Sequence, residues 1–192
     1  MLCSFHSVTN FSLAAIALGL PNLQALDLSF CAVGSPDSVA LQFIVDDMWP
    51  SLHELDVSRN YAVNHQTIER IARAAPNLAY FVSEKSNIGD EAIVALASYC
   101  PHLVEITVDR GSPITDMSLV ALAECCRELR AIRITLPSTE FSVGQVTKRG
   151  IKALARLPYL EELVLECVPG VTLRMLERYI ASEDIVIGFN EA

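Results

Sequence analysis

The sequence has 192 residues, 52% of them hydrophobic, and a formal net charge of −9. This length and apolar content are sufficient for one folded domain with a sizeable core. The negative charge argues against nucleic acid, whose phosphates require a concentrated basic surface, and against anionic membranes. No apolar run approaches the roughly 20 residues that span a bilayer. We therefore expect a folded protein whose partner is neither nucleic acid nor a membrane.

The first predicted element is an apolar helix within FSLAAIALGLP (11–21). This segment is as apolar as the centre of a signal peptide, but no positive charge precedes it and the pattern that follows repeats it. The six cysteines and four histidines show neither C-x-x-C nor H-x-x-x-H spacing. We therefore expect reduced thiols in a protein of the cytoplasm or nucleus, with no metal site and no cofactor.

A repeated pattern follows this helix and continues along the chain. Six segments contain L-x-x-[LIF], and five of them continue to another apolar residue two positions later. The leucines that begin the pattern are separated by 29, 26, 25, 26 and 31 residues, and a proline stands two positions before five of them. Such a period is typical of a protein built from stacked repeats. The six segments are LPNLQALDLSFC (20–31), WPSLHELDVSRN (49–60), APNLAYFVSEKS (75–86), CPHLVEITVDRG (100–111), CRELRAIRITLP (126–137) and LPYLEELVLECV (157–168).

Each segment predicts a short strand, because its last apolar residues are two positions apart and therefore share one face. In the third segment Ser83 replaces one of these apolar residues. The residues between them are expected on the opposite face. The core pairs are Leu26 with Leu28, Leu55 with Val57, Ile106 with Val108, Ile132 with Ile134, and Leu163 with Leu165.

Runs with helical spacing precede the later strands. DEAIVALASYC (90–100), DMSLVALAECC (116–126) and RGIKALARL (149–157) predict helices, and Asp90 and Asp116 are expected to be their N-caps. The prolines are expected to end the helices. A last helix is predicted over 173–184 and a last strand over 184–189. The core residues of the three helices are Ile93, Leu96 and Ala97, then Leu119, Leu122 and Ala123, then Ile151, Leu154 and Ala155.

One strand and one helix cannot bury their apolar faces alone, whereas stacked copies share a continuous core. The predicted fold is α/β: a right-handed solenoid, or horseshoe, with a parallel inner sheet and outer helices. We expect about six to seven repeats, with residues 1–192 forming a single domain.

Two segments identify the type of repeat. NIGDEAIVALASYCPHLVEITV (87–108) and ITDMSLVALAECCRELRAIRIT (114–135) resemble the cysteine-containing subtype of the leucine-rich repeat, whose unit is similar to I-T-D-x-x-L-x-x-L-A-x-x-C-P-x-L-x-x-L-x-L. The resemblance extends over nearly all of the chain and is most specific over 87–136. It departs at the insertion-like stretches 31–40 and 137–147, at Ser83 and in the irregular last unit.

The resemblance implies a protein–protein interaction module of the F-box/LRR type. In such proteins the solenoid selects substrates for an SCF-type (cullin-RING) ubiquitin ligase, which implies a role in ubiquitin-dependent protein catabolism. An upstream F-box docks a Skp-type adaptor, and that F-box is absent from this sequence. We therefore expect the chain to be part of a longer protein, with a Skp-type adaptor as partner only if an F-box precedes Met1.

Two alternatives remain. The solenoid can be a scaffold or receptor fragment without a ubiquitin link, or it can resemble the Ran GTPase-activating proteins. The second alternative requires a catalytic arginine in an N-terminal loop, whereas the first arginine here is Arg59, at a predicted strand end.

No catalytic residue is expected. Cys100 and Cys126 lie at equivalent repeat positions, which favours small buried side chains at a helix-to-strand corner over reactive or metal-binding thiols. The histidines do not cluster, and no Walker phosphate loop, G-x-S-x-G or H-E-x-x-H motif is present. The sequence thus predicts a protein that is not an enzyme.

The third, fifth, seventh and eighth residues from each anchoring leucine are expected to face solvent on the concave sheet. This prediction includes Ser58, Ala131 and Leu136.

Charged residues at these positions are ordered along the sheet. Arg59, Lys85 and Arg110 form a basic column beside an acidic column of Glu84 and Asp109. One interpretation is a solvated sheet whose opposite charges pair across strands; the other is a strip that binds a protein substrate or ligand. The candidate partner-binding residues are Phe30, Asp56, Arg59, Tyr80, Glu84, Lys85, Glu105, Thr107, Asp109, Arg110 and Arg133.

Overall fold

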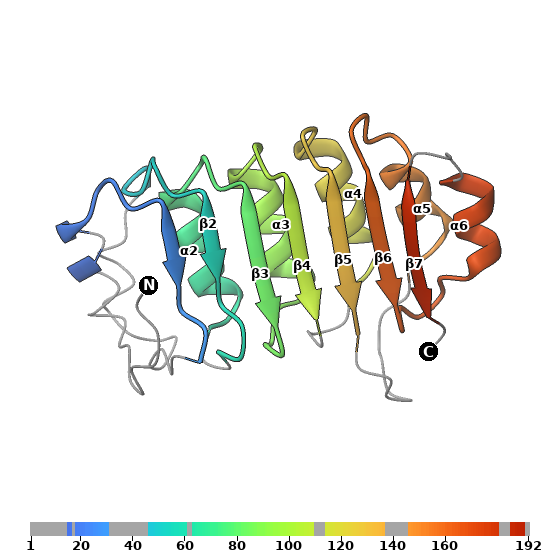
Figure 1. The fold of residues 1–192 in the computed structure, drawn as a ribbon, viewed down its shortest axis with the longest axis horizontal. Coiled ribbons are helices and arrows are strands. Elements are labelled where there is room, and N and C mark those ends of the chain that lie inside the picture. The colour runs from blue at the N-terminus through green and yellow to red at the C-terminus, as the bar shows by residue number, and fades with distance from the viewer. Residues whose placement is uncertain are drawn as a thin grey trace.

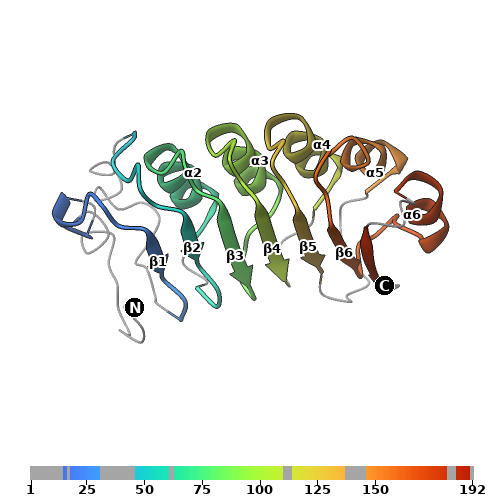
Figure 2. The ribbon, with the colours of Figure 1, turned by 45° about the horizontal axis from the view of Figure 1, so that its top comes forward.

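The computed structural model describes residues 15–16, 18–30, 46–60, 63–109, 114–136, 146–180 and 185–190. Over these ranges seven parallel strands form one sheet in chain order, and helices lie along one of its faces (Figure 1). The described chain curves into an arc with the helices on the outer side and the sheet on the inner side (Figure 2). The predicted α/β solenoid is therefore confirmed.

The elements alternate regularly along the described chain. The strands are β1 (Ala25–Asp27), β2 (Glu54–Asp56), β3 (Tyr80–Glu84), β4 (Glu105–Asp109), β5 (Ala131–Thr135), β6 (Glu162–Glu166) and β7 (Val186–Asn190). The helices are α2 (His65–Ala74), α3 (Asp90–Tyr99), α4 (Asp116–Cys125), α5 (Lys148–Leu154) and α6 (Leu173–Tyr179). Of the predicted first helix, residues 15–16 and 18–19 are helical and the rest of 11–17 lies outside the described residues. None of the helices within the described ranges combines the length and apolar character needed to cross a bilayer.

The sheet keeps one register, so equivalent repeat positions lie side by side. Ile106 of β4 pairs with Phe81 of β3 on one side and with Ile132 of β5 on the other. The ten strand residues predicted to form core pairs are all buried. Each large apolar side chain buried in this way contributes about 1.5–3 kcal/mol of transfer free energy. The stacked repeats therefore share one core between the sheet and the helices.

The helices bury the predicted apolar residues with one exception. Ala155 is exposed, because α5 ends at Leu154 and Ala155 is its C-cap; Ala153 is buried instead. Ser83 is fully buried within the strand, where its hydroxyl hydrogen-bonds to that of Ser86. This pairing satisfies a polar side chain that replaces an apolar one.

The predicted N-cap roles of Asp90 and Asp116 are wrong. The N-caps are Gly89 and Thr115, and each aspartate is the first helical residue. Asp90 instead accepts hydrogen bonds from the following repeat: from Thr115 N at 2.9 Å, Thr115 Oγ1 at 2.5 Å and Ser118 Oγ at 2.5 Å. Its carboxylate therefore lies at the N-terminus of the next helix, where a negative charge is favourable.

Asp116 repeats this arrangement one unit later. It accepts hydrogen bonds from Thr147 N at 2.8 Å, Thr147 Oγ1 at 2.5 Å and Gly150 N at 3.0 Å. A Cβ atom at Gly150 would lie 2.5 Å from Asp116 Oδ1, so only glycine leaves room for this contact. The aspartates thus link α3 to α4 and α4 to α5.

The chain turns sharply after several strands through a left-handed residue. Phe30, Arg59, Lys85 and Cys167 occupy the eighth position of their repeats, and their φ angles are 59°, 54°, 52° and 53°. Backbone hydrogen bonds continue through this turn: Arg59 N donates to Glu84 O at 2.6 Å. The turn therefore extends the inter-strand ladder and presents these side chains at one edge of the sheet.

Candidate functional site

The concave face of β1 to β3 contains a hollow of ≈ 670 Å³. Its apolar wall comes from the strands and from the segment that leads into β1, and three carboxylates, on Asp27, Glu54 and Asp56, contribute to its lining. Such a concave apolar surface with a few polar groups is typical of a binding site. The lining residues are Leu20, Leu23, Ala25, Leu26, Asp27, Glu54, Leu55, Asp56, Tyr80 and Val82.

Two predicted aromatic anchors are exposed on this part of the sheet. Tyr80 is 41% exposed and lines the hollow. Phe30 is 63% exposed, and the guanidinium of Arg59 lies 5.0 Å from the centre of its ring. Exposed aromatic and arginine side chains are the residue types that most often dominate protein interfaces.

The concave face of β4 to β6 is different, because its charges neutralise one another. Arg133 of β5 contacts Glu105 of β4 at 3.2 Å and forms a two-pronged ion pair with Glu162 of β6, its Nε lying 2.8 Å from Oε1. Hydrogen bonding to Glu162 raises the pKa of Arg133 above its ordinary value, and the same contact lowers the pKa of Glu162. The predicted pairing of charges across strands is therefore found here.

The remaining predicted residues lie along the same face. Glu84 pairs in register with Asp109, as the acidic column requires, and Thr107 lies between Val82 and Arg133. Lys85 has no ion-pair partner among the described residues. Arg110 lies outside the described residues, so the basic column consists of Arg59 and Lys85 in the part of the chain that the structure describes.

Three positions predicted to face solvent are buried. Ser58 is buried because its hydroxyl accepts a hydrogen bond from Glu84 N at 3.0 Å. Ala131 is buried because it is a small side chain in register between Glu105 and Glu162, which converge on Arg133. Leu136 joins the hydrophobic core directly after β5.

The cysteines at the repeat corners are structural. Cys100 Sγ lies 3.5 Å from Ala75 O, and Cys126 Sγ lies 3.6 Å from Cys100 O, so each thiol contacts the end of the preceding helix. Burial raises the pKa of both thiols to about 12, which leaves them protonated and unreactive at neutral pH. No group of three or more His, Cys, Asp or Glu side chains in the described ranges is arranged to hold a metal ion.

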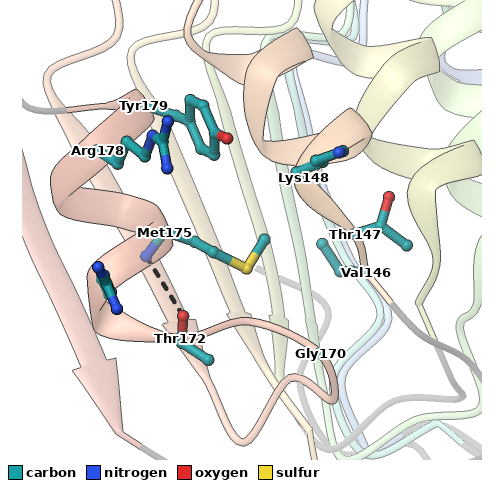
Figure 3. Close-up of a pocket in the computed structure, with 9 residues that line it drawn as sticks. Val146, Thr147, Lys148, Gly170, Thr172, Met175, Arg178 and Tyr179 are labelled. Atoms are coloured by element: carbon teal, nitrogen blue, oxygen red, sulfur yellow. Dashed lines mark hydrogen bonds between the residues drawn. The ribbon is translucent and has the colours of Figure 1, made fainter.

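A second hollow, of ≈ 450 Å³, lies on the helical side of the solenoid between the start of α5 and α6. In Figure 3, Val146, Thr147 and Lys148 lie on one side of it, and Met175, Arg178 and Tyr179 of α6 lie on the other. None of the predicted partner-binding residues lies in this region. The sequence does show that positive charge gathers here, since six of the 14 basic residues fall between 148 and 178.

Comparisons with known proteins agree with the repeat and the fold. A family model described as "Leucine Rich repeat" matches residues 19–41. An internalin (inlF) from Listeria monocytogenes has a similar crystal structure, with a TM-score of 0.52 and 14% sequence identity over 92% of this chain and 50% of the internalin chain. The fold is thus a leucine-rich-repeat solenoid of about seven repeats.

A chain of the yeast Rad7 and Elc1 complex also matches, at 15% identity over 89% of this chain and 63% of that one, but its TM-score of 0.31 is too low to support an argument. This chain spans half the length of the internalin chain. No curated protein matches the sequence.

Proposed function

We propose that this solenoid is a non-catalytic protein-interaction module that holds a partner on the concave face of β1 to β3. The observation that carries the proposal is the hollow of ≈ 670 Å³ with exposed Tyr80 in its wall. Curved repeat proteins present extended concave binding surfaces of this kind. Phe30 and Arg59 extend the surface toward the sheet edge.

The contrast with β4 to β6 supports this placement. There Arg133 is already bonded to Glu105 and Glu162, so a partner would have to separate an existing charge network. Arg59 and Lys85 have no ion-pair partner among the described residues and are available to a ligand carboxylate.

We also propose the cellular role that the cysteine-containing repeat implies, namely substrate recognition for an SCF-type ubiquitin ligase in the cytoplasm or nucleus. The corner thiols of Cys100 and Cys126 support this role, because they occupy the cysteine position of that repeat subtype and pack as buried structural residues. The partner on the concave face is then a protein marked for degradation.

The ligase role is tested by affinity purification of the full-length gene product from its own cells, followed by mass spectrometry. Co-purification of a Skp-type adaptor and a cullin is expected. If a partner binds but neither of these is present at any level above a tag-only control, the solenoid is a scaffold or receptor module without a ubiquitin link.

The binding surface is tested separately with Phe30→Ala combined with Tyr80→Ala. Once a partner has been identified by that purification, this variant should bind it on the order of 100-fold more weakly, because two aromatic anchors are removed. Tyr159→Ala is the matched control, since Tyr159 is 56% exposed and is not among the residues lining the hollow. Equal binding by all three proteins would place the partner elsewhere.

A further inference from the structure

The helical side of the last repeats concentrates positive charge in a chain that is negative overall. α5 and α6 with their flanking residues carry Lys148, Arg149, Lys152, Arg156, Arg174 and Arg178. All six side chains are exposed. Three acidic residues of the same repeat lie on or beside β6, namely Glu161, Glu162 and Glu166. Two of them are already paired, Glu161 with Arg130 and Glu162 with Arg133. Three acidic side chains of the described chain lie on these helices or beside them. Asp116 is already bonded to Thr147 and Gly150, Glu124 lies at the end of α4, and Glu177 lies on α6.

None of these six cations forms an ion pair with a described residue. Lys152 Nζ lies 4.9 Å and Arg178 Cζ 5.6 Å from the centre of the Tyr179 ring. Both cations are therefore held at the Tyr179 ring, beside the hollow, where they can attract an anion.

The hollow between α5 and α6 gives this charge a shaped site. Met175 and Tyr179 provide a partly exposed apolar surface, and Lys148 and Arg178 provide charge (Figure 3). Arg174 and the buried Val146 also line the hollow. The polar groups at its base are already satisfied: Thr147 Oγ1 bonds to Asp116, and Thr172 Oγ1 accepts from Met175 N at 3.3 Å. A ligand is therefore left with two kinds of contact, an apolar side chain in the hollow and carboxylates around it.

We propose that this groove binds an acidic protein segment in which Asp or Glu residues flank a bulky apolar side chain. An apolar side chain would enter against Met175, and its acidic neighbours would pair with Lys148 and Arg178. A long polyanion such as RNA fits less well, because a chain of net charge −9 repels it beyond this patch. The surface lies on the opposite face of the repeats from the concave sheet, so both sides can be occupied together.

The test is fluorescence anisotropy with a labelled twelve-residue peptide of Glu and Asp around a central Leu-Phe pair, at low and at physiological salt. The wild-type chain should bind it, and more weakly as salt is raised. Lys148→Glu combined with Arg178→Glu should weaken binding on the order of tenfold or more, because two attractive contacts become repulsive.

The matched control is Arg70→Glu combined with Arg127→Glu, which changes the net charge equally at exposed residues outside the groove. It should bind the peptide as the wild type does, and circular dichroism should show both variants folded. The proposal is overturned if the peptide does not bind, if the two variants lose equal affinity, or if a single-stranded RNA oligomer binds more tightly than the peptide. A peptide with Ser in place of the Leu-Phe pair should bind more weakly; equal binding would show charge attraction without a groove, and would also overturn it.

Discussion

Replacing Asp90 with alanine should destabilise the solenoid far more than its partly exposed position suggests. The change removes three hydrogen bonds that cross from α3 to the start of α4. Ser118 is fully buried, so leaving its hydroxyl without an acceptor costs about 1–3 kcal/mol, and the two bonds from Thr115 contribute about 0.5–1 kcal/mol each. Loss of a negative charge at the helix N-terminus adds about 0.3–1 kcal/mol. We expect a total of about 2–6 kcal/mol, toward the lower end if the Ser118 hydroxyl turns to a backbone carbonyl.

The assay is urea unfolding followed by far-ultraviolet circular dichroism and by fluorescence of Trp49, the only tryptophan in the chain and fully buried. Dichroism reports on all repeats and Trp49 on the β2 repeat, so a weakened α3–α4 junction should separate the two transitions. Glu91→Ala is the control, because Glu91 is the adjacent acidic residue, is 74% exposed and has one ion pair within the described residues, with the exposed His65. Equal free energies of unfolding for the two variants, within about 0.5 kcal/mol, would refute the role of Asp90.

Three further predictions concern the strands and corners. A hydrogen bond from Arg133 holds the pKa of Glu162 below its ordinary value of 4.5. The ion pair therefore stabilises the fold fully at pH values above 4.5, and this stability is lost as the pH falls through the pKa of Glu162 in the folded state. Arg133→Met should therefore lose less stability than the wild type between about pH 6 and pH 3, as measured by urea midpoints. In the native chain Cys125, which is exposed, should react with iodoacetamide, whereas Cys100, whose pKa burial raises to about 12, should react only after unfolding; peptide mass spectrometry measures both. At Lys85, whose φ is 52°, a valine variant should be about 1–2 kcal/mol less stable than a glycine variant by urea unfolding.

Each of these has an outcome that contradicts it. Parallel pH profiles for wild type and Arg133→Met would mean that the ion pair does not hold the pKa of Glu162 down. Labelling of Cys100 at the rate of Cys125 in the native state would mean that the corner opens. Equal stabilities of the two Lys85 variants would mean that the backbone after β3 does not adopt the left-handed conformation in solution.

Periodicity alone was sufficient to predict the core pairs of the strands and the parallel sheet. Residues two apart in a strand point to the same side, and a constant repeat length makes every strand bury the same positions, so Ile106 and Val108 could be assigned to the core without knowledge of their neighbours. The same reasoning placed Glu84 beside Asp109 and identified Cys100 as a corner residue. These features follow from positions that are equivalent from one repeat to the next.

Features that join one repeat to the next in a particular way required the tertiary structure. The sequence marks Asp90 as a helix-start residue, but only the stacking of α3 on α4 brings its carboxylate to Thr115 and Ser118 instead of to its own helix. Likewise, the strand register brings Glu105 and Glu162 to either side of Arg133, and charge pattern alone does not select these partners.

The two hollows also depend on the tertiary structure. The residues that line them come from several repeats, and the space between them depends on how far apart the strands and helices lie after packing. The sequence by itself therefore determined the repeat, its core and which residues share each face. The distances between units, set by side-chain packing across their boundaries, determined where the two hollows lie.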